Sequence, residues 1–591
     1  MKNKLKMREN IRLFYKGMKL LISCSATFSM AILVLSTISA LVSPFNAILY
    51  KKFLDSIMEM IEVGAWLDSE FQLLFIMLLT SLIGYSINSL LQFTKQIFSD
   101  KLDLFVSESV LQQSIKFPME TFDNAEIYNH ITISLKRTSA SCMNLLDALS
   151  ECFNTIVKAG SFLYIISTLS WKIVPASVFS VIPVLYLSLR INSYWYKIFF
   201  GRAEKNRLIE YLKLLMVKNE NIKEIKLYGV GNKIASFIKK NQIDFLTEDI
   251  KARKVFLRKG FGAHCVDEIA SWTIKIWLLA LSIGNKCSLG TIMLYINSLD
   301  SFKHSINGLF SQISSLHKSL LYLYSVDIIE KEKCADDGIE KLSDEFTEIE
   351  FRNVSFRYPC TSSYAVKNIS LKLERGKTYF IVGFNGSGKT TLLKLLLRLY
   401  KPTEGQILID GINIQDINLD SYYSKISAIF QDFIKYPFTI SENIDIRTKS
   451  KNKQRLFDVL EKVGMNKFVE HLPQKEKTLL MKDWNGGIDM SQGQWQKIAI
   501  ARCIFDDSAI SIFDEPFSSI DAEAETYIID NLRKNCEEKF NIFITHRFSS
   551  ISLTDQIIVM KEGAIIEKGT HETLIQNRGM YFDLYTSQIP K

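Results

Sequence analysis

The sequence lacks any close pair of cysteines. Its nine cysteines are scattered over 591 residues, and no two of them form a C-x-x-C pair. Zinc sites and redox motifs need such spacing, and disulfide frameworks occur mainly in short secreted chains. The cysteines therefore indicate neither a metal centre nor a disulfide scaffold. Cys360 and Cys503 lie in the more polar C-terminal half, where we expect ordinary reduced thiols.

The sequence also lacks the pattern of a cleaved signal peptide. Its first apolar stretch is too long, has no small-residue cleavage pattern, and is followed by further apolar stretches. The net charge of +9 could suggest a nucleic-acid partner. However, basic residues precede the first apolar stretch, as in the cytoplasmic flank of a membrane helix: Lys2, Lys4, Lys6, Arg8, Arg12, Lys16 and Lys19. We therefore expect a membrane protein with no nucleic-acid partner.

Long apolar stretches occupy much of the first 325 residues, whereas the remainder has the composition of a soluble α/β domain. A helix needs about 20 apolar residues to cross the hydrocarbon core of a bilayer. Stretches of this kind lie near 21–48, 72–97, 150–170, 172–195, 266–285 and 288–312. We expect a membrane domain of six helices over 1–325, a charged linker over 326–345 and a soluble domain over 346–591. An even number of spans returns the chain to the cytoplasm before that domain.

Ionisable residues within the expected spans are costly at membrane depth and mark functional paths by default. The candidates are Lys158, Arg190, Lys275, Asp300, Lys303 and His304. The last three share one helix face, which suggests a wet translocation cavity. The alternative is that the helices extend into the cytosol, so that some of these charges are solvated or reach the membrane surface.

A phosphate-binding loop is indicated by "GFNGSGKT" between an apolar strand and a helical stretch. Gly383, Gly388, Lys389 and Thr390 satisfy G-x-x-x-x-G-K-[ST] in the strand–loop–helix setting that the motif requires. The glycines let backbone N–H groups surround a β-phosphate, Lys389 neutralises β- and γ-oxygens, and the Thr390 hydroxyl ligates Mg²⁺.

A second apolar strand, "AISIFDEP", ends in two carboxylates. Asp514 is placed to hold Mg²⁺, and Glu515 follows it at once, where a carboxylate can polarise an attacking water. Further on, "IFITHRFSS" ends an apolar run on His546, which is suited to sensing a γ-phosphate. An acidic turn after a strand would be unremarkable alone, but the phosphate-binding loop upstream makes the functional interpretation stronger.

The stretch "GGIDMSQGQWQKIAIAR" (486–502) changes from a glycine-broken polar segment to a helical pattern at Gln494. A helix that starts on Ser-Gln-Gly-Gln offers unpaired N–H groups and the positive end of its dipole to an anion. No lysine beside it completes a phosphate site within the same segment. We therefore expect the phosphate to come from elsewhere.

The order of these motifs resembles the nucleotide-binding domain of ABC transporters, and the resemblance covers essentially all of 346–591. It implies that Tyr358 stacks on adenine, that Gln431 links Mg²⁺ and the γ-phosphate to the membrane domain, and that Asp521 crosses a dimer interface. It implies catalytic roles for Glu515, His546 and Gln431, and Mg²⁺ ligation by Thr390, Gln431 and Asp514. The implied ATP-binding residues are Tyr358, Gly383, Asn385, Gly386, Ser387, Gly388, Lys389, Thr390, Thr391, Ser491, Gly493, Gln494 and Asp521.

In this family two cassettes pack head to tail, and the signature helix of one faces the γ-phosphate held by the other. The resemblance thus implies a half-transporter that forms a homodimer, with ATP and Mg²⁺ as cofactors. Short cytoplasmic helices near 121–131 and 221–229 would transmit closure to the membrane domain. Two residues depart from the family pattern: Gln492 replaces the first signature glycine, and Ser511 interrupts an apolar strand. We expect activity to survive both.

The whole chain also resembles exporters of lanthipeptides of the nisin type, on "QDFIKYPFTISENI", "SQGQWQKIAIAR" and the helical text over 202–229. That resemblance implies export of a modified precursor peptide with its leader attached, alongside the enzymes that form its thioether rings. The segment before the first span is too short for a peptidase domain, so we expect ATP hydrolysis without peptide hydrolysis.

Three other interpretations remain open from the sequence. A multidrug or lipid exporter would share every ATPase residue. A soluble, non-transporting cassette ATPase would not need six apolar spans. A heterodimer with a second half-transporter is the third, although the intact Glu515 and signature argue mildly against it.

Overall fold

The computed structural model describes residues 7–63, 68–332, 337–359, 361–447, 452–533, 538–545, 547 and 554–588. The chain forms two compact units. The first comprises 1–115 and 126–332, and the second comprises 116–125 and 333–591. The segment 326–331, expected as part of a linker, belongs to the last helix of the first unit.

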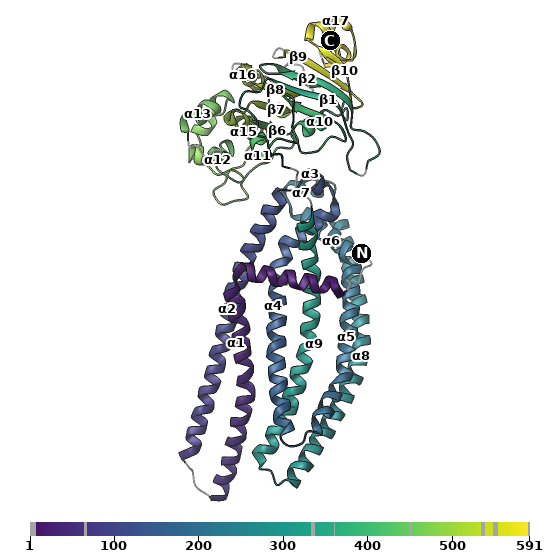
Figure 1. Cartoon of the computed structure of the whole chain (residues 1–591). Coiled ribbons are helices and arrows are strands. Elements are labelled where there is room, and N and C mark those ends of the chain that lie inside the picture. The colour runs from purple at the N-terminus through teal and green to yellow at the C-terminus, as the bar shows by residue number, and fades with distance from the viewer. Residues whose placement is uncertain are drawn as a thin grey trace. The chain divides into compact units, whose positions relative to one another are not determined.

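The first unit is built from long helices (Figure 1). They are α1 (Met7–Val63), α2 (Asp68–Ile115), α4 (Ala125–Ser167), α5 (Ile173–Gly201), α8 (Gly231–Gly284) and α9 (Leu289–Lys331), with the shorter α6 (Ala203–Val217) and α7 (Asn219–Leu227) between α5 and α8. Each expected span coincides with one long helix, apart from a few end residues: 168–170 lie beyond α4, 172 precedes α5, 285 follows α8 and 288 precedes α9. Of the described helices, those over 8–61 and 71–115 are long and apolar enough to cross a membrane by length and composition alone.

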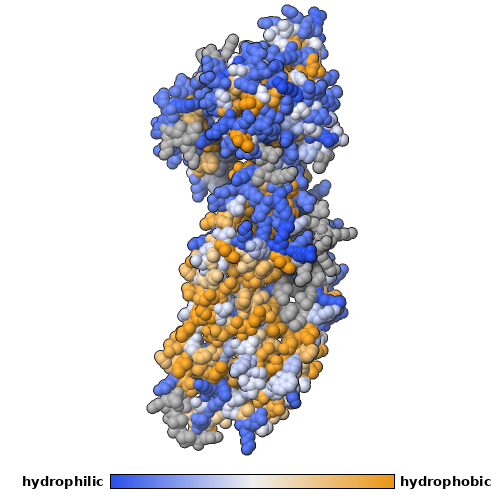
Figure 2. Space-filling view, in the orientation of Figure 1, coloured by the Kyte–Doolittle hydropathy of each residue, from blue (hydrophilic) through white to orange (hydrophobic). Residues whose placement is uncertain are grey.

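The long helices expose apolar side chains over their middle portions, which Figure 2 shows as a broad orange surface. Phe75, Phe93, Phe179 and Ile269 are each at least 60% exposed. A surface of this size would be unusual on a soluble protein, but it is what hydrocarbon requires of a membrane helix. Smaller, buried clusters such as the one around Leu91, Leu145 and Leu323 hold the helices together.

Helix α1 is broken near its start. Ser25 has extended backbone angles, and the segment before it runs across the other helices (Figure 1). Asp327 on α9 anchors this segment by ion pairs with Arg12 and with Lys16, the latter at 3.2 Å. Lys331 adds a third pair to Asp327 at 2.7 Å. These ion pairs fix the N-terminal segment of α1 to the C-terminal end of α9, the last helix of the same unit.

The ionisable residues expected to line a cavity are partly held in ion pairs between α8 and α9. Lys303 lies 2.6 Å from Asp267, and both side chains are 8% exposed. Lys275 lies 2.8 Å from Asp300. A buried charge without a partner would be strongly destabilising, so these pairs explain how the two helices tolerate their charges.

The second unit contains two sheets. The four-stranded antiparallel sheet has the order β2-β1-β4-β5, from β1 (Glu348–Phe356), β2 (Val366–Glu374), β4 (Glu404–Ile409) and β5 (Ile412–Asn413). The six-stranded sheet has the order β10-β9-β3-β8-β7-β6, from β3 (Thr378–Val382), β6 (Ile426–Ile429), β7 (Ile510–Asp514), β8 (Phe540–Ile544), β9 (Gln556–Lys561) and β10 (Ala564–Gly569). All its neighbouring strands are parallel except β10.

Strands β3, β7 and β8 are buried along their whole length, as expected for the centre of a parallel sheet covered on both faces. The covering helices include α10 (Lys389–Leu396), α13 (Lys453–Lys462), α15 (Gln492–Asp506) and α16 (Ala522–Arg533). Shorter helices are α11 (Leu419–Tyr423), α12 (Ile440–Ile444), α14 (Asn466–Glu470), α17 (His571–Asn577) and α18 (Met580–Gln588). Because β3, β8 and β7 run parallel, the loops after β3 and β7 emerge at the same edge of this sheet.

A short helix from the loop after α2 belongs to this second unit. It is α3 (Met119–Asp123), and its Asp123 accepts a hydrogen bond of 2.5 Å from the Tyr400 hydroxyl. The family resemblance implied short helices near 121–131 and 221–229. The structure forms α3 and the start of α4 over the first and α7 over the second.

Candidate nucleotide site

The loop between β3 and α10 has a backbone that glycine alone adopts easily. Gly386 and Gly388 have φ of 80° and 100°, in the left-handed region. A Cβ at Gly388 would also lie 2.5 Å from the Ala365 carbonyl oxygen. The loop therefore needs these glycines for its own shape, and that shape turns its N–H groups toward a common centre.

Lys389 is folded back over this loop. Its Nζ donates to the carbonyl oxygens of Gly383 at 2.8 Å and Phe384 at 3.0 Å, and the residue is 6% exposed. Burial lowers the pKa of Lys389, while the nearby carboxylates of Glu515 and Asp514 oppose this shift. An anion in the loop would exchange weak carbonyl partners for a charge-assisted bond.

Ser387 shows that the loop is built for a ligand. Its hydroxyl oxygen is buried and has no hydrogen-bond partner among the described residues. Buried polar groups are nearly always paired, so an orphaned hydroxyl at the centre of a phosphate-binding loop fits a phosphate oxygen as its missing partner.

Asp514, at the end of β7, lies beside the start of α10. Burial raises the pKa of Asp514 to about 6, and the charge of Glu515 adds to this, whereas a hydrogen bond from Thr390 opposes it. Thr390, Asp514 and Gln431 supply hydroxyl, carboxylate and amide oxygens. These hard donors suit Mg²⁺, which fills its remaining positions with water and phosphate oxygens. A bound dication would also offset the cost of ionising a buried carboxyl.

Glu515 has a strained backbone and a directed side chain. Its φ is 51°, which is uncommon for a residue with a Cβ, and its N–H donates to the Ile544 carbonyl at 2.9 Å. The Gln431 amide donates to its carboxylate at 3.0 Å. The structure thus brings together Gln431 and Glu515, which are 84 residues apart in sequence.

The helix that follows the polar segment is α15, and its first turn is capped by its own residues. Ser491 accepts from the Gln494 N–H at 3.2 Å, and the Gln494 side chain accepts from the Ser491 N–H at 2.9 Å. The expectation of a bare helix start is therefore only partly right. A capping box satisfies the third N–H and occupies the Gln494 side chain.

Gly493 is required by packing within its own chain. A Cβ there would lie 2.7 Å from the Ser519 carbonyl oxygen, a backbone atom that cannot move aside cheaply. The tolerated residue at the other signature position, Gln492, is exposed. This contrast explains why Gln492 can replace a glycine while Gly493 remains.

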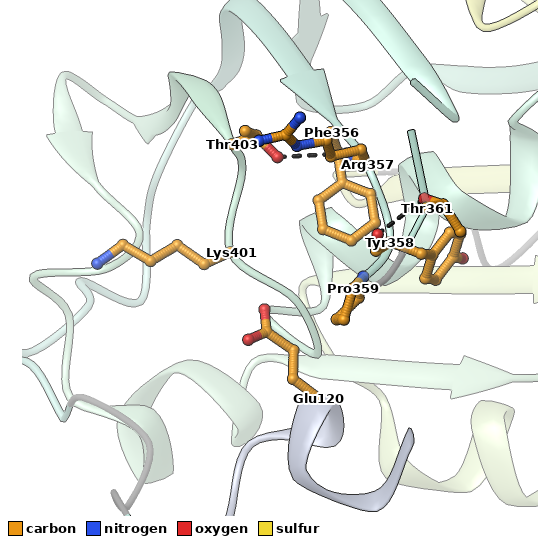
Figure 3. A pocket seen from close by; sticks show the side chains of 8 residues that line it. All are labelled: Glu120, Phe356, Arg357, Tyr358, Pro359, Thr361, Lys401 and Thr403. Carbon is orange, nitrogen blue, oxygen red and sulfur yellow. Dashed lines mark hydrogen bonds between the residues drawn. The ribbon is translucent and has the colours of Figure 1, made fainter. Parts of the chain in front are cut away.

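Tyr358 lies at the start of the loop after β1 and reaches the phosphate-binding helix. Its hydroxyl is 3.1 Å from the Thr391 hydroxyl, and its ring packs edge-on against Phe356 and Tyr400. A cavity of about 420 Å³ beside it is lined by Glu120, Phe356, Arg357, Tyr358, Pro359, Thr361, Lys401 and Thr403 (Figure 3). The opening is large enough for a nucleobase.

Asp521 and His546 have different outcomes. The Asp521 carboxylate accepts from the Ala524 N–H at 2.9 Å, which caps the first turn of α16 and lowers the pKa of Asp521. His546 lies outside the described residues. Ser511, which departs from the family pattern, is buried in β7. Its hydroxyl forms a hydrogen bond with the Cys503 thiol, so it takes part in packing.

Comparisons with known proteins agree with this geometry. A family model described as ABC transporter matches residues 366–518. The subtilin transport ATP-binding protein of Bacillus subtilis is 32% identical over 485 residues, which cover 80% of this chain and 78% of that protein. The chain is an ABC transporter. The nisin transport ATP-binding protein of Lactococcus lactis subsp. lactis is 27% identical over 586 residues, with 97% of this chain and 95% of that protein covered.

The ATP-dependent lipid A-core flippase of Escherichia coli (strain K12) is 30% identical over 347 residues, covering 57% of this chain and 59% of that protein. A solved structure of a bacterial Atm1-family ABC exporter with ATP bound matches with a TM-score of 0.79 at 20% identity, over 95% of this chain and 98% of that chain. The fold class expected from the sequence, a membrane helical bundle fused to an α/β cassette, is confirmed. An ABC transporter couples an ATPase domain to transport across a membrane.

Sequence reasoning missed two residues that organise the ABC transporter's cassette. The Arg547 guanidinium donates to the carbonyl oxygens of Ser518 and Ile520, each at 3.1 Å, and to the Glu525 carboxylate at 2.8 Å. Gln496 holds the same loop from the other side. Neither has a motif of its own, because each has partners about 20 residues or more away in sequence, and most of those partners are backbone atoms. The capping box was missed as well, although its Ser-x-x-Gln spacing is a signal in the sequence.

Proposed function

We propose that this ABC transporter uses Mg²⁺-dependent ATP hydrolysis to export a peptide, a modified lanthipeptide precursor, across the bacterial cytoplasmic membrane. The observation that carries the proposal is similarity along the whole chain, including the membrane unit, to the nisin transport protein. The cassette is similar among transporters of many cargos, whereas the membrane unit contacts the cargo. Six membrane-crossing helices, α1, α2, α4, α5, α8 and α9, complete the transport path in this proposal.

We assign the site residues the roles that the family resemblance implies, and their geometry supports this assignment. Lys389 leaves the carbonyl oxygens of Gly383 and Phe384 to bind phosphate oxygens, and Ser387 donates to another. Tyr358 stacks on the adenine. Thr390, Asp514 and Gln431 would hold Mg²⁺, which when bound neutralises charge on the phosphates and aligns them.

The Glu515 carboxylate orients a water against the γ-phosphorus and accepts its proton as the new P–O bond forms and the bond to ADP breaks. His546 completes the contacts to the γ-phosphate. The Gln431 amide nitrogen donates to the Glu515 carboxylate at 3.0 Å, so the amide oxygen would be available to Mg²⁺ while the nitrogen orients the base.

A homodimer supplies the missing part of the site. Ser491, Gly493 and Gln494 at the start of α15 face a phosphate held by the second copy, and Asp521 lies at the same interface. Closure of two cassettes around ATP is a two-state change that a ligand biases. Helix α3, joined to the cassette through Asp123 and Tyr400, is one route to the membrane helices.

Stimulation of ATP hydrolysis by cargo tests the proposal. Purified protein in lipid vesicles is mixed with a lanthipeptide precursor that carries its leader, with the same precursor without its leader, or with a lipid A preparation. We expect the leader-bearing precursor to raise ATPase activity and to accumulate inside inverted vesicles. The Lys389→Ala variant serves as the inactive control.

A lipid exporter is the second candidate, because the lipid A-core flippase shares 30% identity over just over half of this chain. Stimulation by lipid A without any response to precursor would favour it and refute peptide export. The lanthipeptide proposal further implies that ring-forming enzymes associate with the transporter. Co-purification of the ring-forming enzymes with the tagged transporter would support that partnership.

A further inference from the structure

Gln496, in the second turn of α15, is a buried polar residue that the proposed roles do not use. It is 2% exposed, and a buried amide is costly unless its donors and acceptor are paired. Here the pairing is with one loop. Its Nε2 donates to the Glu515 carbonyl and to the Ser518 hydroxyl, both at 3.0 Å, and its Oε1 accepts from the Ser519 N–H at 2.8 Å.

The loop that Gln496 holds begins with the strained residue. Glu515 has φ of 51°, a strained backbone conformation that persists only where neighbouring groups enforce it. Its N–H is held by Ile544 on β8, and its carbonyl is held by Gln496. Both ends of the Glu515 backbone are therefore fixed, and the direction of its carboxylate depends on them.

Contact between α15 and this loop is close as well as polar. Gly493 approaches Ser519 so tightly that a Cβ would lie 2.7 Å from the carbonyl oxygen. The capping box of Ser491 and Gln494 makes the first turn of α15 rigid. A movement of the start of α15 is thus passed directly to residues 515–519.

We propose that Gln496 is a positioning residue for hydrolysis, which couples the tip of α15 to the backbone of Glu515 in the same chain. The inference rests on the proposed function, in which that tip binds the ATP held by the second copy. Engagement of the partner's phosphate by α15 then sets the Glu515 that acts on this chain's own ATP. In each chain, ATP bound at the partner's phosphate loop therefore affects the position of the base that acts on the chain's own ATP.

The main test replaces the amide with an apolar side chain of similar length, Gln496→Met, in the full-length protein in lipid nanodiscs. We expect kcat to fall at least about tenfold, because a misdirected base loses much of its general-base contribution. Binding of a fluorescent ATP analogue should stay within about twofold, because the phosphate loop is untouched. Cooperativity in ATP concentration should decrease together with kcat.

A graded series and a matched control separate positioning from folding. Ser518→Ala removes one of the three hydrogen bonds and should lower kcat only about twofold. Asn531→Ala removes an amide that joins α16 to the Lys462 carbonyl at 3.1 Å, away from the loop, and should lower thermal stability without changing kcat. If Gln496→Met does not fold, Gln496→Glu keeps the acceptor for Ser519 and serves in its place.

Combination with Glu515→Gln gives the deciding readout. If Gln496 acts through the carboxylate of Glu515, the double variant should hydrolyse ATP no more slowly than Glu515→Gln alone. An additive further loss, or a Gln496→Met kcat within twofold of wild type, would overturn the inference. Wild-type protein that neither binds nor hydrolyses ATP would instead refute the proposed function itself.

Discussion

At the scale of single residues, the site is a set of groups held in costly states. Ser387 has an unpaired buried hydroxyl, Lys389 is buried against carbonyl oxygens, and Glu515 has a left-handed backbone. Asp514 is buried beside Glu515, and burial raises its pKa to about 6. A phosphate would pair with the Ser387 hydroxyl and the Lys389 ammonium, and a dication would favour the ionised form of Asp514.

Replacement of the proposed base is the first residue-scale prediction. Glu515→Gln keeps the acceptor for the Gln431 amide but cannot accept a proton from water. We expect ATP binding to remain and hydrolysis to fall at least about 100-fold, the usual contribution of a general base. Export should stop with it. The measurements are nucleotide binding and single-turnover hydrolysis.

The matched control is Glu470→Gln, which removes an exposed carboxylate at the end of α14 and should leave turnover unchanged. Secretion at a normal rate in the Glu515→Gln variant would show that another group acts as the base.

At the scale of elements, ion pairs fix the position of one helix against another more specifically than hydrophobic packing does. In the first unit, Asp327 ties the crossing segment of α1 to the end of α9. Asp327 lies beyond the last expected membrane span, which ends near residue 312. Burial by itself raises the pKa of Asp327, but hydrogen bonds from Lys331 and Arg12 and the charge of Lys16 outweigh this effect and lower the pKa to about 2.

This depressed pKa predicts a pH dependence of stability. A carboxyl whose pKa is lower in the folded state stabilises that state above its unfolded pKa of about 4, and this stabilisation is lost as the pH falls toward 2. We therefore expect the melting temperature in detergent to fall between pH 5 and pH 3 more steeply in wild type than in Asp327→Asn. At pH 7 the variant should be less stable by about 1–3 kcal/mol.

Asp344→Asn is a suitable control. That carboxylate is exposed, and it pairs with Lys425 within the second unit, whereas Asp327 belongs to the first unit. Parallel pH profiles for wild type and Asp327→Asn would contradict the role assigned to Asp327.

At the scale of the whole molecule, each chain carries both a phosphate-binding loop and a set of signature residues on its single cassette. The phosphate loop leads into α10, whereas the signature residues start α15. In the proposed homodimer each ATP site takes Lys389 from one copy and Ser491 from the other. A C₂ dimer creates two such sites from one sequence.

Complementation between two inactive variants tests this shared site. Ser491→Glu puts a negative charge opposite the partner's phosphate at a helix start that tolerates it, and Lys389→Ala removes the phosphate lysine of its own chain. Each variant alone should be inactive. Co-expression with different tags should restore up to about one quarter of wild-type activity, because about half of the dimers are mixed and each holds one intact site.

Absence of any recovery in purified mixed dimers would contradict sites shared between copies. Full turnover by a strictly monomeric, ATP-saturated protein would contradict them as well.

The sequence by itself determined most of the features that are encoded within a few neighbouring residues. The phosphate loop, the carboxylates after β7, the helix start at Ser491 and the long apolar stretches were all readable, because each depends on local spacing or on length. Only the tertiary structure decided which distant groups meet: Gln431 with Glu515, Gln496 with Ser519, and Lys303 with Asp267. The physical reason is that buried polar groups must find partners, and packing of remote segments decides which partners are within reach.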